Sequence, residues 1–224
     1  RLRAAGKVKD LEALFYSSPI NGHCGISHTR WATHGAPSTE NAHPHTSGDQ
    51  LALVHNGIIE NHEELRRELQ QCGCQFSSET DTEVMVHLVA RLMASGLDLF
   101  CAVRKAVERL RGAFAIAVVS AAEPGVIVGA RKGSPLVLGV GHGEHFLASD
   151  IYPLLGETDS FVFLAEGDVV SLNVDGYQLV DLNNQRVDRP VKQVETRADS
   201  VQRGIYPHYM LKEIFEQPQA VAET

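Results

Sequence analysis

The sequence has 224 residues, 43% of them hydrophobic and 21% charged, which is typical of a globular chain long enough to bury a sizeable core. Its formal net charge of −8 argues against a nucleic-acid-binding surface, because such a surface needs a basic patch. No apolar run approaches the length of a membrane span and no signal-peptide core follows Arg1, so we expect a cytoplasmic protein without a membrane partner.

The first 60 residues give four local predictions and one turn signal. In chain order the predictions are an amphipathic helix over 7–18, a strand over 23–31, a loop over 35–50 and a short strand over 51–54. The loop is rich in Gly, Pro, Ser, Asn and His, and loops of this length are usually functional or disordered. Asn56-Gly57 is the strongest short signal for a hairpin turn, so a turn is the interpretation that the local sequence favours.

Three helices are predicted in the next 50 residues, each from apolar residues at helical spacing that end at a glycine. They begin after Asn61, Asp81 and Asp98. Asn61 with Glu64 three residues later has the pattern of a capping box. Asp81 and Asp98 are most simply interpreted as side-chain caps of the second and third helix.

From residue 113 onward the pattern changes to short apolar strands separated by glycine-rich turns. The predicted strands cover residues 114–119, 126–128, 136–138, 145–147, 161–164, 168–172 and 177–180. Short strands joined by turns make antiparallel sheets, and the apolar runs imply that both sheet faces are covered. Helices together with antiparallel sheet predict a layered α+β domain.

The composition changes again near residue 180, which gives the predicted domain boundaries. Residues 1–180 form the predicted domain. Residues 181–204 are polar, have almost no apolar periodicity and are interpreted as a connector. Residues 205–224 regain aromatic and apolar content and are interpreted as the start of a further segment.

Seven of the eleven histidines lie close together in the sequence, which indicates either a polar site or a metal cluster. They are His23, His28, His34, His43, His45, His55 and His62. Only His43-Pro44-His45 forms a tight pair, and no helical His-x-x-x-His or Cys-x-x-Cys spacing is present. We therefore expect no metal and no cofactor. The four cysteines are expected to be reduced thiols.

The densest group of hydrogen-bonding residues is the stretch His28-Thr29-Arg30-Trp31-Ala32-Thr33-His34-Gly35. Arg30 has a planar guanidinium that suits a carboxylate, and Trp31, the only tryptophan, offers a rigid wall. Thr33 and His34 add hydrogen-bonding groups. Such a set would suit a small zwitterion such as a free amino acid. The alternative is a strand end that enters a polar loop, with Arg30 in a surface ion pair.

Four motifs, in this order and spacing, resemble the glutaminase domain of the glutamine–fructose-6-phosphate aminotransferase family. They are residues 28–35 quoted above, Asn41-Ala42-His43-Pro44-His45, His55-Asn56-Gly57-Ile58-Ile59-Glu60-Asn61 and Ser78-Glu79-Thr80-Asp81-Thr82-Glu83. The match continues at 133–136, 148–150 and 209–218. The resemblance implies the N-terminal-nucleophile hydrolase fold, a four-layer αββα sandwich of antiparallel sheets.

The same resemblance implies an activity and partners. The family hydrolyses the side-chain amide of L-glutamine and passes the ammonia to fructose 6-phosphate in a sugar isomerase domain, which yields glucosamine 6-phosphate. Residues 205–224 would lead into that second domain, which is missing from this chain. As a full-length protein it would be a homodimer.

Carried over residue by residue, the resemblance implies a role for each motif. Arg30 would hold the α-carboxylate of glutamine and Asp81 its α-ammonium group. The Asn56 side chain and the Gly57 N–H would form the oxyanion hole, where preorganised donors stabilise developing charge. The pocket would further be lined by Trp31, Thr33, His34 and His43.

The chain departs from the family at its first residue, because the family's nucleophile is an N-terminal Cys and residue 1 here is Arg. Cys24-Gly25-Ile26 mimics the family's opening Cys-Gly-Ile, but Cys24 has no free α-amino group, so we interpret it as a small buried cysteine. We expect this chain, truncated at its N-terminus, to be inactive alone. The alternatives are a non-catalytic glutamine-binding or regulatory module, or the glutaminase domain of another amidotransferase such as amidophosphoribosyltransferase.

Overall fold

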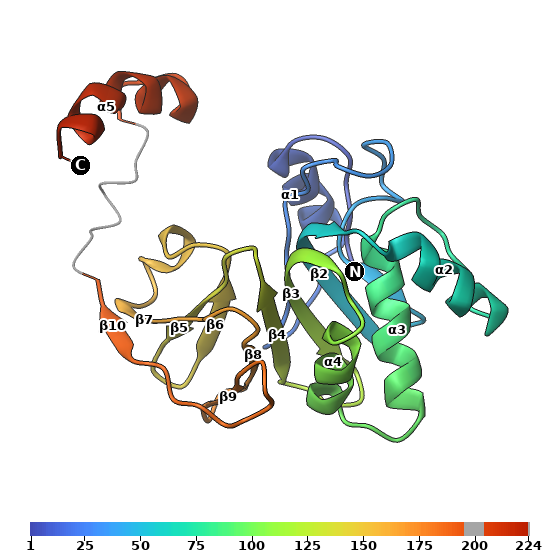
Figure 1. Cartoon of the computed structure of the whole chain (residues 1–224). Helices are drawn as coiled ribbons and strands as arrows, with labels where there is room; N and C mark the ends of the chain where they lie inside the picture. The colour runs from blue at the N-terminus through green and yellow to red at the C-terminus, as the bar shows by residue number, and fades with distance from the viewer. Residues whose placement is uncertain (195–203, 224) are drawn as a thin grey trace.

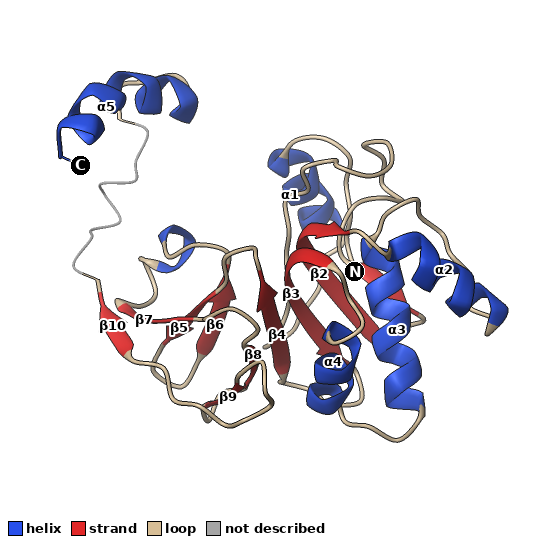
Figure 2. Ribbon diagram, viewed as in Figure 1, coloured by secondary structure: helices blue, strands red, loops and turns tan. Residues whose placement is uncertain are grey.

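Two antiparallel β-sheets form the centre of the structure, a computed structural model that describes residues 1–194 and 204–223 (Figures 1 and 2). The first sheet contains, in spatial order, β1 (His45–Ser47), β2 (Leu51–Ile59), β3 (Gly112–Ser120), β4 (Ile127–Lys132), β8 (Val169–Leu172) and β9 (Tyr177–Val180). The second contains, in spatial order, β10 (Val191–Gln193), β7 (Ser160–Phe163), β5 (Val137–Val140) and β6 (His145–Ala148).

Helices and a second sheet cover the two faces of the first sheet. One face packs against α3 (Thr82–Ala94) and α4 (Leu99–Val107), and α2 (His62–Gln71) packs beside α3, with the largest core cluster between helices and sheet (Figure 2). Apolar residues of both sheets form a second core cluster. A third cluster lies on the outer face of the second sheet, under the short 3₁₀ helix η1 (Tyr152–Leu154). The predicted α+β sandwich of two stacked antiparallel sheets is therefore confirmed.

Two further helices lie near the ends of the chain. The predicted first helix is confirmed as α1 (Val8–Ser17), although it has no buried residue. α5 (Tyr209–Glu223) lies in the predicted C-terminal segment. No helix of the described residues is both long and apolar enough to cross a membrane.

The stretch that we interpreted as a connector contributes to the second sheet. Strand β10 pairs with β7, with Val191 opposite Val162, so the sheet extends beyond residue 180. The part of the predicted connector at 195–203 lies outside the described residues.

Two local predictions near the polar stretch are wrong. Residues 23–31 are irregular rather than a strand, because they hold a single large aliphatic side chain, Ile26, and pair with no described strand.

Asn56-Gly57 is not a hairpin turn either, since β2 continues through it with Gly57 opposite Phe114 of β3. Gly57 has a φ of +129°, and a Cβ there would lie 2.0 Å from the carbonyl oxygen of Ala113. Glycine is thus required by the close approach of two strands. The loop predicted over 35–50 also holds the short strand β1.

The helix caps agree with the predictions at one position of three. Asp98 caps α4 by accepting a hydrogen bond from the backbone N–H three residues on, at 2.7 Å. The Asn61 side chain makes no cap and instead donates to the carbonyl of Arg109 and accepts from the N–H of Arg111, both at 2.9 Å. Asp81 makes no cap bond either, because its carboxylate has a partner in β2.

Candidate functional site

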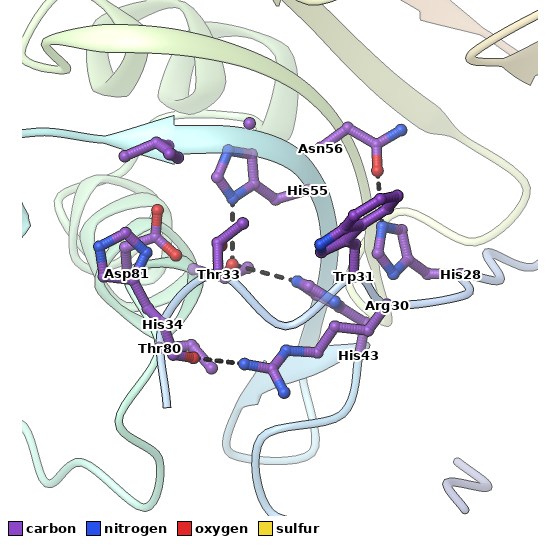
Figure 3. A pocket seen from close by; sticks show the side chains of 13 residues that line it. His28, Arg30, Trp31, Thr33, His34, His43, His55, Asn56, Thr80 and Asp81 are labelled. Carbon is purple, nitrogen blue, oxygen red and sulfur yellow. Dashed lines mark hydrogen bonds between the residues drawn. The ribbon is translucent and has the colours of Figure 1, made fainter. Parts of the chain in front are cut away.

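One pocket of about 240 Å³ gathers the residues that the resemblance assigned to a site (Figure 3). All eight predicted site residues line it, namely Arg30, Trp31, Thr33, His34, His43, Asn56, Gly57 and Asp81. It is also lined by five residues to which no role was assigned: His28, His55, Ile58, Thr80 and Thr82. These residues come from β2, the N-terminal end of α3 with the loop before it, the irregular segment around Arg30 and, for His43, the loop before β1. The structure brings the residues together, while their roles stay predictions.

Strand β2 presents two consecutive side chains to the pocket from opposite faces of the sheet, because strand residues alternate. His55 is 4% exposed, and its Nδ1 lies 3.0 Å from Oγ1 of Thr82 at the start of α3. Asn56 is exposed, and its Oδ1 lies 2.7 Å from Nε2 of His28. Since an amide oxygen only accepts, His28 is the donor in this contact.

A single hydroxyl organises two of the histidines. Oγ1 of Thr82 lies 3.0 Å from Nε2 of His43 and 3.0 Å from Nδ1 of His55 (Figure 3). A hydroxyl has one proton and two lone pairs, so Thr82 donates to at most one of the two rings. At least one of the rings therefore donates its N–H to this oxygen.

Four histidines at or beside the pocket, His28, His43, His45 and His55, are uncharged at neutral pH because their pKa values are lowered. The ring centroids of His28 and His43 are 4.1 Å apart, and those of His43 and His45 are 5.1 Å apart. Burial lowers the pKa of His43 to about 2 and the pKa of His45 and of His55 to about 4. Burial also lowers the pKa of His28, although its hydrogen bond with Asn56 opposes this. No group of three or more metal-binding side chains occurs among the described residues.

Arg30 holds its guanidinium at the edge of the pocket through its own loop. Its Nη1 donates to the carbonyl of Ala36 at 3.1 Å, and its Nη2 donates to the carbonyls of His34 and Gly35, the latter at 3.3 Å. Nε takes part in none of these bonds. Among the described residues Arg30 forms no ion pair, so the surface ion pair of the alternative is not found in this part of the chain.

Asp81 lines the same pocket from the residue immediately before α3. It is 3% exposed, and its Oδ2 accepts a hydrogen bond from the N–H of Ile59 at 2.8 Å, which ties the start of α3 to the end of β2. Of the thirteen lining residues that the structure describes, Arg30 is the one guanidinium and Asp81 the one carboxylate. One fixed cation and one fixed anion suit the two charged ends of an amino acid.

The buried side chain of Glu83, which is 2% exposed, holds the loop before Asp81 in place through hydrogen bonds. Its carboxylate accepts four hydrogen bonds of 2.6–2.8 Å, from the backbone N–H and the hydroxyl of both Ser77 and Ser78. Burial alone would raise the pKa of Glu83, but the nearby His87 ring, with Nε2 3.7 Å from Oε1, and the hydrogen bonds from the two serines lower it below the ordinary value. This anchored loop sets the position of Asp81.

Trp31 and Cys24 are both exposed. Trp31 lines the pocket and is 89% exposed, so it lies at the pocket mouth. Cys24 is exposed and not buried as expected, because the irregular segment around it packs few apolar side chains. Desolvation by nearby atoms raises the pKa of the Cys24 thiol. None of the four cysteines lines the pocket within the described part of the chain.

Comparisons with known proteins show which family the chain resembles. The family described as "Glutamine amidotransferase domain" matches residues 28–156. Glutamine–fructose-6-phosphate aminotransferases (isomerizing) of Pseudomonas putida and Pseudomonas aeruginosa are 50% and 51% identical to the chain over 224 residues. These alignments cover 100% of this chain and 37% of each relative, so the chain spans little more than a third of their length.

A solved structure extends the similarity to the fold. A glutamine phosphoribosylpyrophosphate amidotransferase from B. subtilis, complexed with ADP and GMP, superposes with a TM-score of 0.58. It is 25% identical, and the match covers 71% of this chain and 35% of that one.

Proposed function

The chain belongs to the family of glutamine amidotransferase domains, with the N-terminal-nucleophile hydrolase fold, and we propose that its pocket binds glutamine for hydrolysis of the side-chain amide. One observation supports this most. The eight residues to which the resemblance gave a role line a single pocket of about 240 Å³, although they are spread over residues 30–81. A pocket of this size suits a free amino acid better than a large ligand.

In this proposal the two charged ends of glutamine are held separately. The guanidinium of Arg30 binds the α-carboxylate, and the carboxylate of Asp81 binds the α-ammonium group. Charge-assisted hydrogen bonds of this kind are the strong ones, and they fix orientation as well as affinity. With both ends fixed, the side-chain amide of glutamine extends toward Asn56 at the end of β2.

The proposed chemistry begins with attack of a cysteine thiolate on the amide carbon. The carbonyl oxygen then becomes negatively charged, and the Asn56 side-chain N–H and the Gly57 backbone N–H stabilise that charge. Collapse of the intermediate expels ammonia and leaves a thioester, which water hydrolyses to glutamate. Because no cysteine of the described residues lines the pocket, we propose that this thiol belongs to a part of the protein other than residues 1–224.

The proposed acceptor of the ammonia is fructose 6-phosphate, bound in a second domain of the complete protein and converted to glucosamine 6-phosphate. Support comes from the two aminotransferases, which are 50% and 51% identical to the chain, against 25% for the phosphoribosylpyrophosphate enzyme. A homodimer and a cytoplasmic location, both implied by the resemblance, are part of this proposal.

The experiment incubates the complete protein with glutamine, with and without fructose 6-phosphate, and measures the products formed. We expect release of glutamate and, with the sugar phosphate present, formation of glucosamine 6-phosphate. Binding of glutamine without release of ammonia would favour the non-catalytic module. Transfer of ammonia to phosphoribosyl pyrophosphate instead of the sugar phosphate would favour the other amidotransferase.

A further inference from the structure

The amide of Asn56 is held by a residue with no assigned role. Oδ1 of Asn56 lies 2.7 Å from Nε2 of His28, whereas Asn56 itself lies at the exposed end of β2. An exposed asparagine ordinarily rotates about its side-chain bonds, and the ends of its amide group can exchange places. A donor fixed on Oδ1 removes this freedom and directs the NH₂ group away from His28.

The position of His28 is set by contacts that lead back to a buried helix. Its ring lies against the ring of His43, with centroids 4.1 Å apart and planes at 61°. Nε2 of His43 lies 3.0 Å from Oγ1 of Thr82. Thr82 is 1% exposed and is the first residue of α3. A continuous series of side chains thus connects the core of the molecule to Asn56.

We propose that His28 is a positioning residue for the reaction, which orients the Asn56 amide so that its NH₂ group faces the carbonyl oxygen of the substrate. This inference rests on the proposed function. The requirement is a donor at the position of Nε2. Both the neutral Nε2–H form and the protonated form of His28 provide it, so the contact does not depend on the charge of the ring.

The proposal explains why a strand end can serve as an oxyanion hole. The backbone N–H of Gly57 is fixed by β2 itself, whereas the Asn56 side chain needs an outside contact to become equally rigid. Preorganised donors cost no reorganisation at the moment when charge develops, and a misplaced donor loses most of its effect. His28 supplies that contact from a segment that pairs with no described strand.

The test compares two substitutions of similar shape in the complete protein. His28→Gln places an amide N–H near the position of Nε2, whereas His28→Met removes the donor and keeps the length. We expect His28→Met to lower kcat for glutamine hydrolysis by about ten- to a hundredfold, with KM changed less than about threefold, since one misoriented oxyanion donor acts on the transition state. We expect His28→Gln to retain activity within about fivefold of the unaltered protein. His142→Met, at an exposed turn, is the control.

A double substitution separates positioning from general damage to the fold. If His28 acts through Asn56, then His28→Met combined with Asn56→Ala is no slower than Asn56→Ala alone, because residues that act as a unit are not additive. Multiplicative losses, equal losses in the Gln and Met variants, or a rise in KM at unchanged kcat would overturn the inference. Should His28→Met fail to fold, the Gln variant alone decides, because a loss larger than about tenfold there contradicts the donor role. An unaltered protein that releases no glutamate would instead contradict the proposed function.

Discussion

The carboxylate of Asp81 accepts a hydrogen bond from the backbone N–H of Ile59 at 2.8 Å. The contact joins the first turn of α3 to the last residue of β2. Two elements that carry pocket residues are thereby fixed to each other by the side chain that we propose to bind the ammonium group of glutamine.

Asp81→Asn tests the charge separately from this structural contact. The amide oxygen of asparagine can still accept from Ile59, but the negative charge is lost. We expect KM for glutamine to rise by about tenfold or more, because the ammonium group loses its charged acceptor. The melting temperature should change less, because the N–H of Ile59 keeps an acceptor. Steady-state kinetics and thermal unfolding of the same samples provide the measurement. A large fall in melting temperature with unchanged KM would assign Asp81 a structural role only.

Arg30→Ala tests the other end of the substrate. Removing the guanidinium leaves the α-carboxylate without its partner, and we expect KM for glutamine to rise by about ten- to a hundredfold while kcat falls less. Arg30→Lys keeps the charge without the planar geometry and should give an intermediate KM. Equal KM values in all three proteins would contradict the assignment.

Asn56→Ala and Asn61→Ala are a matched pair within seven residues of the chain. The first removes a proposed oxyanion donor, and we expect kcat for glutamine hydrolysis to fall by about 10²–10³ with little change in KM. The second removes bonds to Arg109 and Arg111, outside the pocket, and should lower stability by about 1–2 kcal/mol without lowering kcat. The proposed role of Asn56 fails if the two variants exchange these effects.

The pH dependence of stability follows from the buried histidines. Burial lowers the pKa of His43 to about 2 and the pKa of His45 and of His55 to about 4. An unfolded histidine has a pKa of about 6.5, so below that pH the unfolded state binds more protons than the folded state. The free energy of unfolding is therefore unaffected by these histidines above about pH 6.5. Below that pH it falls by about 1.4 kcal/mol per histidine and pH unit. Urea unfolding at several pH values measures this slope, and a flat profile between pH 6.5 and 4.5 would contradict it.

Gly57→Ala tests why β2 continues through a sequence that ordinarily forms a turn. A Cβ at Gly57 would lie 2.0 Å from the carbonyl oxygen of Ala113, whereas Gly48 also has a positive φ but open space around it. We expect Gly48→Ala to lower the free energy of unfolding by about 1 kcal/mol and Gly57→Ala by more than about 3 kcal/mol. Denaturant unfolding of both variants provides the comparison, and equal losses would show that φ alone decides.

The helices and most strands could be predicted because their signals are local. The apolar spacing of α2, α3 and α4 lies within each segment, and so do the apolar runs of β3 to β9. The strand predicted over 23–31 is wrong because a strand also needs a partner, which no local pattern reports. The turn at Asn56-Gly57 is wrong for a related reason, since the close neighbour of Gly57 is Ala113, on another strand.

In the candidate site, too, part could be predicted from the sequence and part could not. Its eight residues came from motifs that resemble a known family, and spacing alone left Arg30 equally consistent with a surface ion pair. His28 and Thr82 stood inside those motifs, but nothing in the sequence indicated that one would contact Asn56 or that the other would bridge two histidines. Such contacts depend on how α3 packs beside β2, so they appear only in the folded chain.

Trp31 gives the pocket its own optical reporter. It is the only tryptophan of the chain, and at 89% exposure it stands in solvent at the pocket mouth. Its emission therefore reports on this one place, without background from other indoles. A ligand or neighbouring domain that covers the mouth would shift that emission toward the blue, which allows occupancy to be followed by fluorescence titration in the absence of turnover.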